Sequence, residues 1–169
     1  MDPSEPEMFL FSDDGSIPNS KYPLLIYHDA FSQRGNEGAD WLEERFASND
    51  WTNSWRWGVY PFHHYHSNTH EVLGVFRGNA LLQMGGEHGS KMRLVAGDVI
   101  VIPAGVGHKC LEHTDDFTVV GAYPGGIEPD LMKDVTRDHP GAVRRIATVA
   151  LPSTDPLYGR GKGLLIYWK

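Results

Sequence analysis

Short apolar runs separated by glycine-containing turns fill residues 51 to 123, and this pattern limits the folds that the chain can adopt. Turns such as Arg77-Gly78-Asn79 and Ala96-Gly97-Asp98 interrupt the runs before any of them reaches the length of an ordinary helix. Regularly spaced short runs between turn residues are typical of antiparallel sandwiches and barrels. The sequence therefore predicts an all-β body, with strands near residues 58–65, 71–76, 80–84, 92–95, 99–102, 109–111 and 117–123.

The segments that flank this body predict a few peripheral elements. The apolar runs Leu24–Tyr27 and Leu164–Trp168 predict two more strands. Asp40 is followed three residues later by Glu43, which is the spacing of a capping box and predicts a helix from Asp40 to about residue 49. Pro140 stands where the first turn of a later helix is expected, after the glycines at 125 and 126.

Composition bounds the domain organisation and the class of partner. With 169 residues, 40% of them hydrophobic and 22% charged, the chain fits one globular domain. We expect a flexible or loosely packed arm at 1–21, which is polar and broken by proline and glycine, and a single domain at 22–169. The net charge of −7 and the lack of a Lys/Arg run argue against nucleic acid as a partner.

Cysteine usage and the N-terminus bear on the compartment. The single cysteine, Cys110, allows neither a disulfide framework nor a thiolate zinc site within one chain. The N-terminal residues lack the charged-then-apolar pattern of a signal peptide, and no apolar run approaches membrane-spanning length. We therefore expect a cytoplasmic protein with no membrane partner.

Four of the nine histidines fall between residues 63 and 70, and they carry the functional signal. His64 and His66 are two residues apart on a predicted strand, so both rings leave the same face. The next strand can bring Glu71 alongside them, and His108 follows a separate Gly/Pro-rich turn. Three imidazoles and one carboxylate suit a divalent metal such as Fe, Mn, Ni, Zn or Cu. His70 is an alternative ligand by spacing, and a polar pocket rim without metal is the other interpretation.

The same residues resemble the two conserved motifs of the cupins. The first motif, G-(x5)-H-x-H-(x4)-E-(x6)-G, fits Gly58 to Gly78, and the second, G-(x5)-P-x-G-(x2)-H, fits Gly97 to His108. The second motif usually ends in asparagine, and Glu112 stands at that position here. More closely, the chain resembles the YjlB-like single-domain cupins from about residue 22 to its end. The segments that carry this resemblance are Asn53-Ser54-Trp55, 63–74 (HHYHSNTHEVLG), 96–108 (AGDVIVIPAGVGH), 119–126 (VVGAYPGG) and 155–169.

The resemblance implies a small cupin-type jelly-roll β-barrel with a few short peripheral helices. It implies one divalent transition metal per chain, held by His64, His66, Glu71 and His108. It does not define a reaction, because cupins include dioxygenases, isomerases, decarboxylases, storage proteins and sensors. A homodimer is expected by analogy with the family, formed through outward-facing apolar residues such as Trp57, Val59, Val72 and Phe76.

Strand alternation gives an expected cavity lining and the candidate catalytic residues. With His64 and His66 inward, alternation places Tyr60 inward as well, and Trp57 and Val59 outward. It also predicts that Gly58, Phe62, Leu73, Val75, Arg77, Cys110 and Glu112 point inward and that Tyr65 points outward, with either Val119, Gly121 and Tyr123 or Val120 and Ala122 inward on the last central strand. Such a lining is mostly apolar, as small-molecule sites are.

Three of these residues are candidates for catalysis. Glu112 is the candidate general base, and Tyr60 and Tyr123 are candidates for proton donation or substrate orientation. Cys110 is expected to pack as a small buried hydrophobe.

Two functions from different classes follow. The first is a metal-dependent enzyme acting on a small aromatic or otherwise oxygenated substrate, with dioxygenase chemistry ahead of isomerisation, dehydration or decarboxylation. The second is a non-catalytic cupin that binds a metal or small ligand as a sensor, carrier or structural module.

Overall fold

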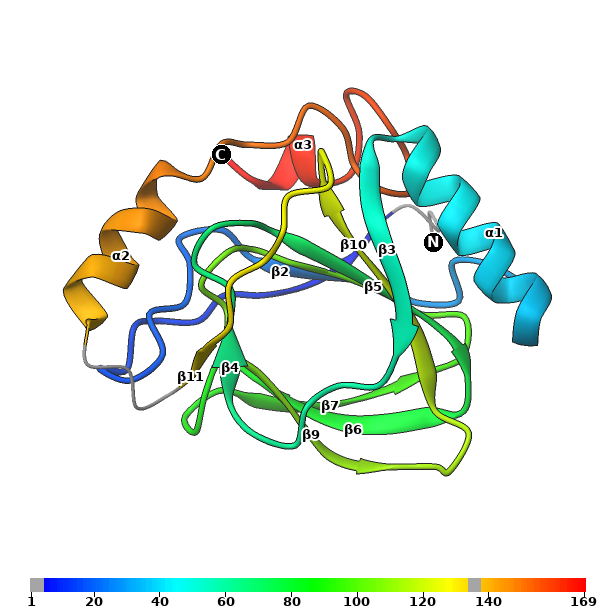
Figure 1. Cartoon of the computed structure of the whole chain (residues 1–169), viewed down its shortest axis with the longest axis horizontal. Coiled ribbons are helices and arrows are strands. Elements are labelled where there is room, and N and C mark those ends of the chain that lie inside the picture. The colour runs from blue at the N-terminus through cyan, green and yellow to red at the C-terminus, as the bar shows by residue number, and fades with distance from the viewer. Residues whose placement is uncertain (1–4, 134–137) are drawn as a thin grey trace.

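Two antiparallel sheets face each other in the computed structural model, which describes residues 5–133 and 138–169 (Figure 1). The six-stranded sheet has the order β1 (Glu7–Phe9), β2 (Leu24–Tyr27), β8 (Val99–Ile102), β5 (Glu71–Arg77), β10 (Thr118–Pro124) and β3 (Trp51–Trp57). The five-stranded sheet has the order β11 (Met132–Lys133), β4 (His64–Tyr65), β9 (His108–His113), β6 (Asn79–Met84) and β7 (Ser90–Val95). The prediction of a mainly-β fold with two antiparallel sheets is confirmed.

The space between the sheets holds one hydrophobic core. Alternate residues of each strand point into it, for example Leu73 and Val75 of β5 and Leu82 and Met84 of β6. Cys110 belongs to this core and is buried, as expected for a small hydrophobe. The core reaches the cavity described below, because Leu73 belongs to both.

A second core lies on the outer face of the six-stranded sheet. Helix α1 (Gly35–Ser48) covers Val72 and Phe76 with Leu42 and Phe46, and the C-terminal segment covers the rest with Leu164 and other apolar residues (Figure 1). Two apolar residues of the face expected to form a dimer interface are therefore covered by the chain itself.

Glycine allows the close approach of α1. A Cβ at Gly74, which is on β5, would meet Leu42 Cδ2 at 2.6 Å.

Of three local expectations outside the sheets, two are wrong and one is confirmed. Helix α1 begins at Gly35 after Arg34, without a side-chain cap, so the prediction that Asp40 caps it is wrong; Asp40 instead binds Arg56 of β3. Residues 164–168 do not form a strand, because Leu164–Tyr167 is the short helix α3. A short apolar run does not distinguish the two by itself. Helix α2 (His139–Thr148) has Pro140 in its first turn, as predicted.

The described part of the expected arm, residues 5–21, and the segment before β4 also differ from the expectation, and residues 1–4 lie outside the described residues. Residues 58–63 are a loop, so the predicted strand at 58–65 shrinks to β4. Within the expected arm, β1 pairs with β2. Ile17 is buried, and the Asn19 side chain bonds the backbone of Gly85 and Gly107.

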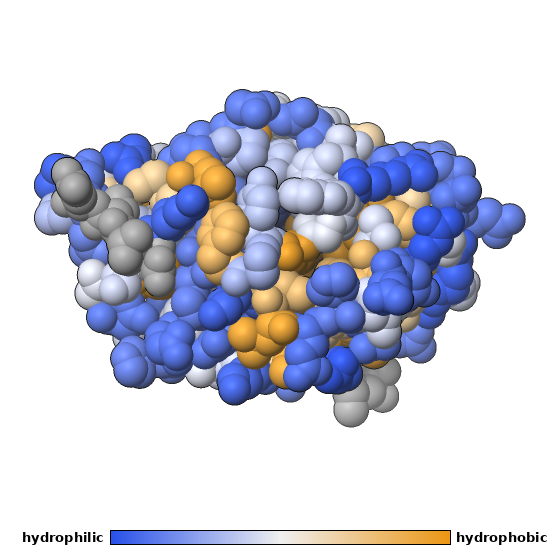
Figure 2. All heavy atoms as spheres, turned by 60° about the horizontal axis from the view of Figure 1, so that its bottom comes forward, coloured by the Kyte–Doolittle hydropathy of each residue, from blue (hydrophilic) through white to orange (hydrophobic). Residues whose placement is uncertain are grey.

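Among the described residues, no helix has both the length and the apolar character needed to cross a membrane. Several large apolar side chains are nonetheless exposed, including Trp57 at 61% and Leu131 at 46%. Figure 2 shows apolar side chains reaching the surface among polar ones on one face of the molecule.

Candidate metal centre

Both sheets deliver side chains to the open end of the barrel. His64 lies on β4 and pairs with His108 of β9, and His66 follows two residues after His64. Glu71 is the first residue of β5 in the opposite sheet. The predicted cluster is thus assembled from residues up to 44 positions apart, because a β4–β9 pair faces the start of β5.

Three of these side chains form a tight group. The Nε2 atoms of His66 and His108 lie 3.4 and 3.3 Å from Oε1 of Glu71. One ligand atom from each of the three residues lies within 4.8 Å of the other two. Glu71 and His108 are buried, and the His66 side chain is 11% exposed. This His-Glu-His group can hold a metal ion.

Backbone carbonyl groups orient the imidazole rings. Nδ1 of His66 lies 2.5 Å from the carbonyl oxygen of Asp130, and Nδ1 of His108 lies 3.1 Å from that of Val106. Because a carbonyl oxygen only accepts, each Nδ1 carries the donated proton and each Nε2 is left to act as a ligand. The donor set and its orientation therefore fit a divalent transition metal.

The charges of the group are mutually dependent. Burial acts to raise the pKa of Glu71, but His66 and His108 outweigh it and hold that pKa well below its usual range. Burial acts to lower the pKa of His66, and the Glu71 carboxylate outweighs it and raises that pKa. The Glu71 carboxylate thus favours a proton on His66, and a metal ion bound at Nε2 would have to displace that proton.

His64 and His70 have different environments from the group. The His64 ring lies 4.0 Å from the ring of His108, and burial lowers the pKa of His64 to about 2. Its role as a fourth ligand remains a prediction. His70 Nδ1 accepts the backbone N–H of Ala104 and Nε2 lies 3.1 Å from the carbonyl oxygen of Ala150. Both nitrogens of His70 are therefore occupied by the backbone, and the alternative of His70 as a ligand is not supported.

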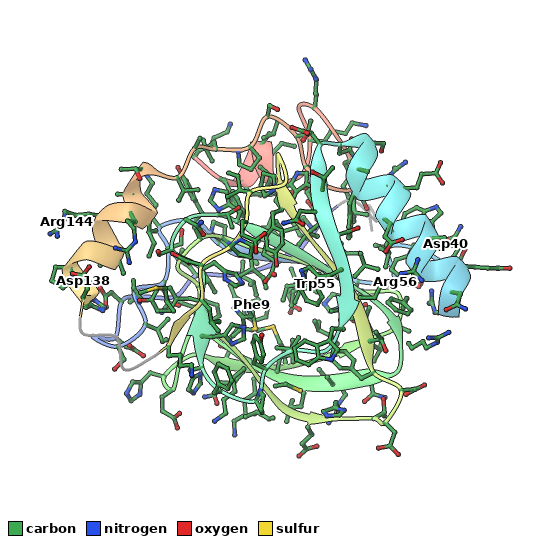
Figure 3. All side chains as sticks on the ribbon, in the orientation of Figure 1. Phe9, Asp40, Trp55, Arg56, Asp138 and Arg144 are labelled. Carbon is green, nitrogen blue, oxygen red and sulfur yellow. The ribbon has the colours of Figure 1, made fainter. Side chains whose placement is uncertain are left out.

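A cavity of about 280 Å³ opens onto the group. Aromatic and aliphatic side chains form most of its wall, and Trp55 points into the barrel from β3 (Figure 3). The Trp55 ring lies across Gly121 of β10, where any side chain would collide with it. The lining residues are Trp55, Trp57, Gly58, Val59, Tyr60, His64, His66, Glu71, Leu73, His108, Tyr123, Pro129, Asp130 and Leu131.

Comparisons with known proteins place the chain in a family. The family model described as a cupin domain matches residues 58–120, which include all four predicted ligands. Over 166 residues the chain is 45% identical to the "Uncharacterized protein YjlB" of Bacillus subtilis (strain 168), and the alignment covers 97% of each protein. The chain is a cupin of the YjlB family.

Solved structures similar to this cupin are more distant. The Mn(II)-containing oxalate decarboxylase of Bacillus subtilis matches 69% of the chain at 18% identity with a TM-score of 0.40, and the match covers 29% of that protein. A double-stranded beta-helix protein from Klebsiella pneumoniae matches 77% of the chain and 80% of its own length at 16% identity, with a TM-score of 0.36. These likenesses concern the fold alone.

The two tyrosines predicted for the site of this cupin line the cavity, and the predicted base does not. The Tyr123 hydroxyl accepts from Trp55 Nε1 at 2.8 Å and also bonds Glu71. Glu112 is exposed and lies 3.6 Å from Arg93, so the expectation that it faces the cavity is wrong. The register between β9 and β6 shifts between Cys110 and Glu112, and this bulge breaks the alternation that pointed Glu112 inward.

The loop at 58–63 overturns the other lining predictions. Trp57 and Val59 line the cavity although alternation pointed them outward, and Phe62 is not among the lining residues. The period of two applies only within a strand, and these residues are outside one or at its end. Tyr60 still reaches the cavity and packs against His64, with ring centroids 5.2 Å apart.

Sequence reasoning missed Trp55 and the segment 128–131. Trp55 belongs to β3, and the polar residues of this strand do not form a pattern that predicts a strand. Asp130 is 64 residues from His66, and no sequence pattern signals that its carbonyl group meets that ring. Asn68 fixes the segment by donating to the carbonyl of Glu128 and accepting from the N–H of Asp130. Asn68, a polar residue between His66 and Glu71, was the only sequence signal that another segment is held near this turn.

Proposed function

We propose that this cupin is a metal-dependent enzyme that acts on a small, oxygenated, apolar or aromatic substrate. The observation that carries the proposal is the meeting of two imidazole Nε2 atoms and a buried carboxylate beside an aromatic-lined cavity. One divalent transition metal per chain (Fe, Mn, Ni, Zn or Cu) suits His66, Glu71 and His108. We add His64 as a fourth ligand because its ring lines the same cavity.

The metal, when bound, would supply Lewis acidity or dioxygen chemistry to a substrate oxygen. The chain's own residues orient the substrate and hold protons. Burial, followed by the negative charge of Glu71, raises the pKa of Tyr123 far above its usual value. Its phenol therefore stays neutral and holds a proton at the hydroxyl oxygen beside Glu71. Tyr60 forms the wall next to His64 and limits how the substrate can turn.

Among possible reactions we place dioxygenase chemistry first, and isomerisation, dehydration or decarboxylation second. Oxygen consumption separates the two groups, because only the first uses dioxygen. An oxygen electrode with metal-loaded protein and a panel of phenols and diketones makes this measurement. Turnover without oxygen uptake would favour the second group.

A non-catalytic binding cupin is the second candidate, and one observation favours it. The predicted base Glu112 lies outside the cavity. Of the carboxylates in the described lining, Glu71 faces the imidazoles and Asp130 binds Ser67. Tight ligand binding without turnover across the panel would support this candidate over the enzyme.

Elemental analysis of untagged protein tests the metal proposal directly. We expect close to one metal per chain in the wild type, and a loss of most of it in His66→Ala and His108→Ala. His113→Ala is the matched control, because His113 lies on β9 with His108 but is exposed. His64→Ala tests the fourth ligand separately. A metal-free wild type after supply of all five metals would refute the proposal.

A further inference from the structure

The charges around the cavity are one-sided. None of the described residues that line it is lysine or arginine, whereas Glu71 and Asp130 are carboxylates. The nearby cations have other partners: Lys133 Nζ lies over the Phe62 ring at 5.0 Å, and Arg145 Nε donates to Ser67 Oγ. Arg56 follows Trp55 along β3 but points the other way, toward Asp40 on α1 (Figure 3).

The metal would therefore be the main positive charge that a ligand meets. A divalent ion beside the Glu71 carboxylate leaves one unit of positive charge at the site. One oxygen that loses its proton on binding would balance this charge. A second anionic group would have to lie against the rest of the wall.

That wall gives a second anionic group no partner. Away from the histidines it consists mainly of Trp55, Trp57, Val59, Leu73 and Leu131, with Pro129 beside them. A carboxylate or phosphate placed there would lose its water without gaining a charged partner, which is strongly unfavourable. Apolar ligand surface would instead be stabilised there by burial.

Cavity size limits the ligand further. An apolar cavity of about 150 Å³ accepts a benzene molecule. The present cavity, at about 280 Å³, leaves room for one ring with small substituents.

We infer that the ligand of this site is a molecule of about one ring, largely apolar, with one ionisable hydroxyl group of the phenol or enol type and no other charge. The hydroxyl would face His66, Glu71 and His108, and the apolar remainder would lie toward Trp55 and Leu73. This inference rests on the proposed function, because the accounting of charge includes the metal. It names the substrate class and separates it from small dicarboxylates and phosphate esters.

Calorimetric titration of the zinc-loaded protein tests the inference with a matched pair of probes. Para-cresol and 4-hydroxybenzoate differ by a methyl group against a carboxylate, and malonate is a small dicarboxylate. We expect para-cresol to bind at least about tenfold more tightly than 4-hydroxybenzoate, and malonate more weakly still. Equal or tighter binding of either carboxylate, or no binding of para-cresol, would overturn the inference.

A charge variant and its control sharpen the test. Leu131→Arg adds a cation to the cavity wall and is expected to shift the preference toward 4-hydroxybenzoate by at least about tenfold. Leu151→Arg should leave the order unchanged, because Leu151 is outside this cavity and has nearly the same exposure, 48% against 46% for Leu131. An unchanged order in Leu131→Arg would count against the role of wall charge.

Metal content of the same samples separates this inference from the proposed function. Zinc uptake with a preference for carboxylates would leave the function standing and overturn the substrate class. A preference for para-cresol without zinc uptake would overturn the metal-dependent function and support the selectivity of the wall.

Discussion

Two buried carboxylates, Asp155 and Glu71, are 0% and 3% exposed, yet their partners differ in kind. Asp155 lies in the C-terminal segment and receives four hydrogen bonds. The donors are the backbone N–H groups of Leu157, Tyr158 and Leu164 and the hydroxyl of Tyr27, at 2.7 to 3.0 Å. Glu71 meets the ring nitrogens of His66 and His108 and the hydroxyl of Tyr123, beside a cavity.

The difference separates a carboxylate with largely fixed partners from one whose partners could bind a metal ion. Three of the four donors to Asp155 are backbone N–H groups, which cannot leave or change their charge, so its set of partners is largely permanent. The imidazole partners of Glu71 are titratable, and their Nε2 atoms could also bind a metal ion in place of the proton between them. Burial alone does not separate the two; the chemistry of the partners does.

Removing Asp155 should give the largest effect on folding. Asp155→Ala leaves four donors without an acceptor, and we expect the free energy of unfolding to fall by about 4 kcal/mol. Urea denaturation measures this loss, with exposed Asp115→Ala as the control. Metal content per folded chain should not change. A loss below about 1 kcal/mol would show that the C-terminal segment does not depend on this carboxylate.

His70 links the two regions and should make stability depend on pH. It precedes Glu71 but packs on Trp168 in the outer core, with ring centroids 4.8 Å apart. Burial lowers the pKa of His70 from 6.5 to about 4, so below pH 6.5 the unfolded chain binds a proton that the folded chain refuses. The contribution is fully present above pH 6.5 and is lost as the pH falls toward 4.

The expected size of this His70 effect is about 3 kcal/mol between pH 7.5 and pH 4. Denaturation of the wild type and His70→Gln at both pH values measures it. The wild type should lose about that much more stability on acidification than the variant does. His113→Gln, which changes an exposed ring, should behave as the wild type. Equal pH dependence in His70→Gln and wild type would assign the effect to other groups.

Glu71→Gln should act mainly on metal binding, whereas Asp155→Ala should act on stability alone. We expect metal affinity to fall by about 100-fold, equivalent to about 3 kcal/mol, because the ligand loses its charge. The metal-free protein should also lose stability, because the pairing that lowers the Glu71 pKa is gone, but less than in Asp155→Ala, since His66 can release its proton. Chelator competition measures affinity, and Glu87→Gln is the control because Glu87 pairs with His63 at 3.0 Å outside the group. Unchanged affinity would contradict the ligand assignment.

Two asparagines, Asn68 and Asn49, hold the segments that lie beside Glu71 and Asp155, respectively. Asn68 holds the segment whose Asp130 carbonyl orients His66, whereas Asn49 donates to the carbonyl of Pro156 near Asp155. Each alanine variant should cost about 1 kcal/mol of stability. Only Asn68→Ala should lower metal affinity, by about tenfold, because outer partners orient ligands. Equal metal affinities in Asn68→Ala and Asn49→Ala would show that Asn68 does not position His66.

Local patterns explain how much of this molecule could be predicted from sequence. The motif spacing gave His66, Glu71 and His108, because a short turn brings Glu71 back beside His66 and the second motif adds His108. The central strands followed from turn glycines. Trp55 and Asp130 could not be found, since their places depend on long-range packing. Leu164–Tyr167 was misassigned because four apolar residues fit either a strand or a turn of helix.

Glu112 should give the smallest effect, and it tests the correction that the structure makes to the predicted site. Its side chain is 69% exposed and faces Arg93, because the bulge in β9 turns it away from the cavity. Glu112→Gln should change stability by less than about 0.5 kcal/mol and leave metal and para-cresol affinity within about twofold. Tyr123→Phe, which removes a cavity hydroxyl bonded to Trp55 and Glu71, is the contrasting variant and should weaken para-cresol binding. If Glu112→Gln lowered para-cresol affinity more than Tyr123→Phe does, Glu112 would have to face the cavity, and the path of β9 described here would be wrong.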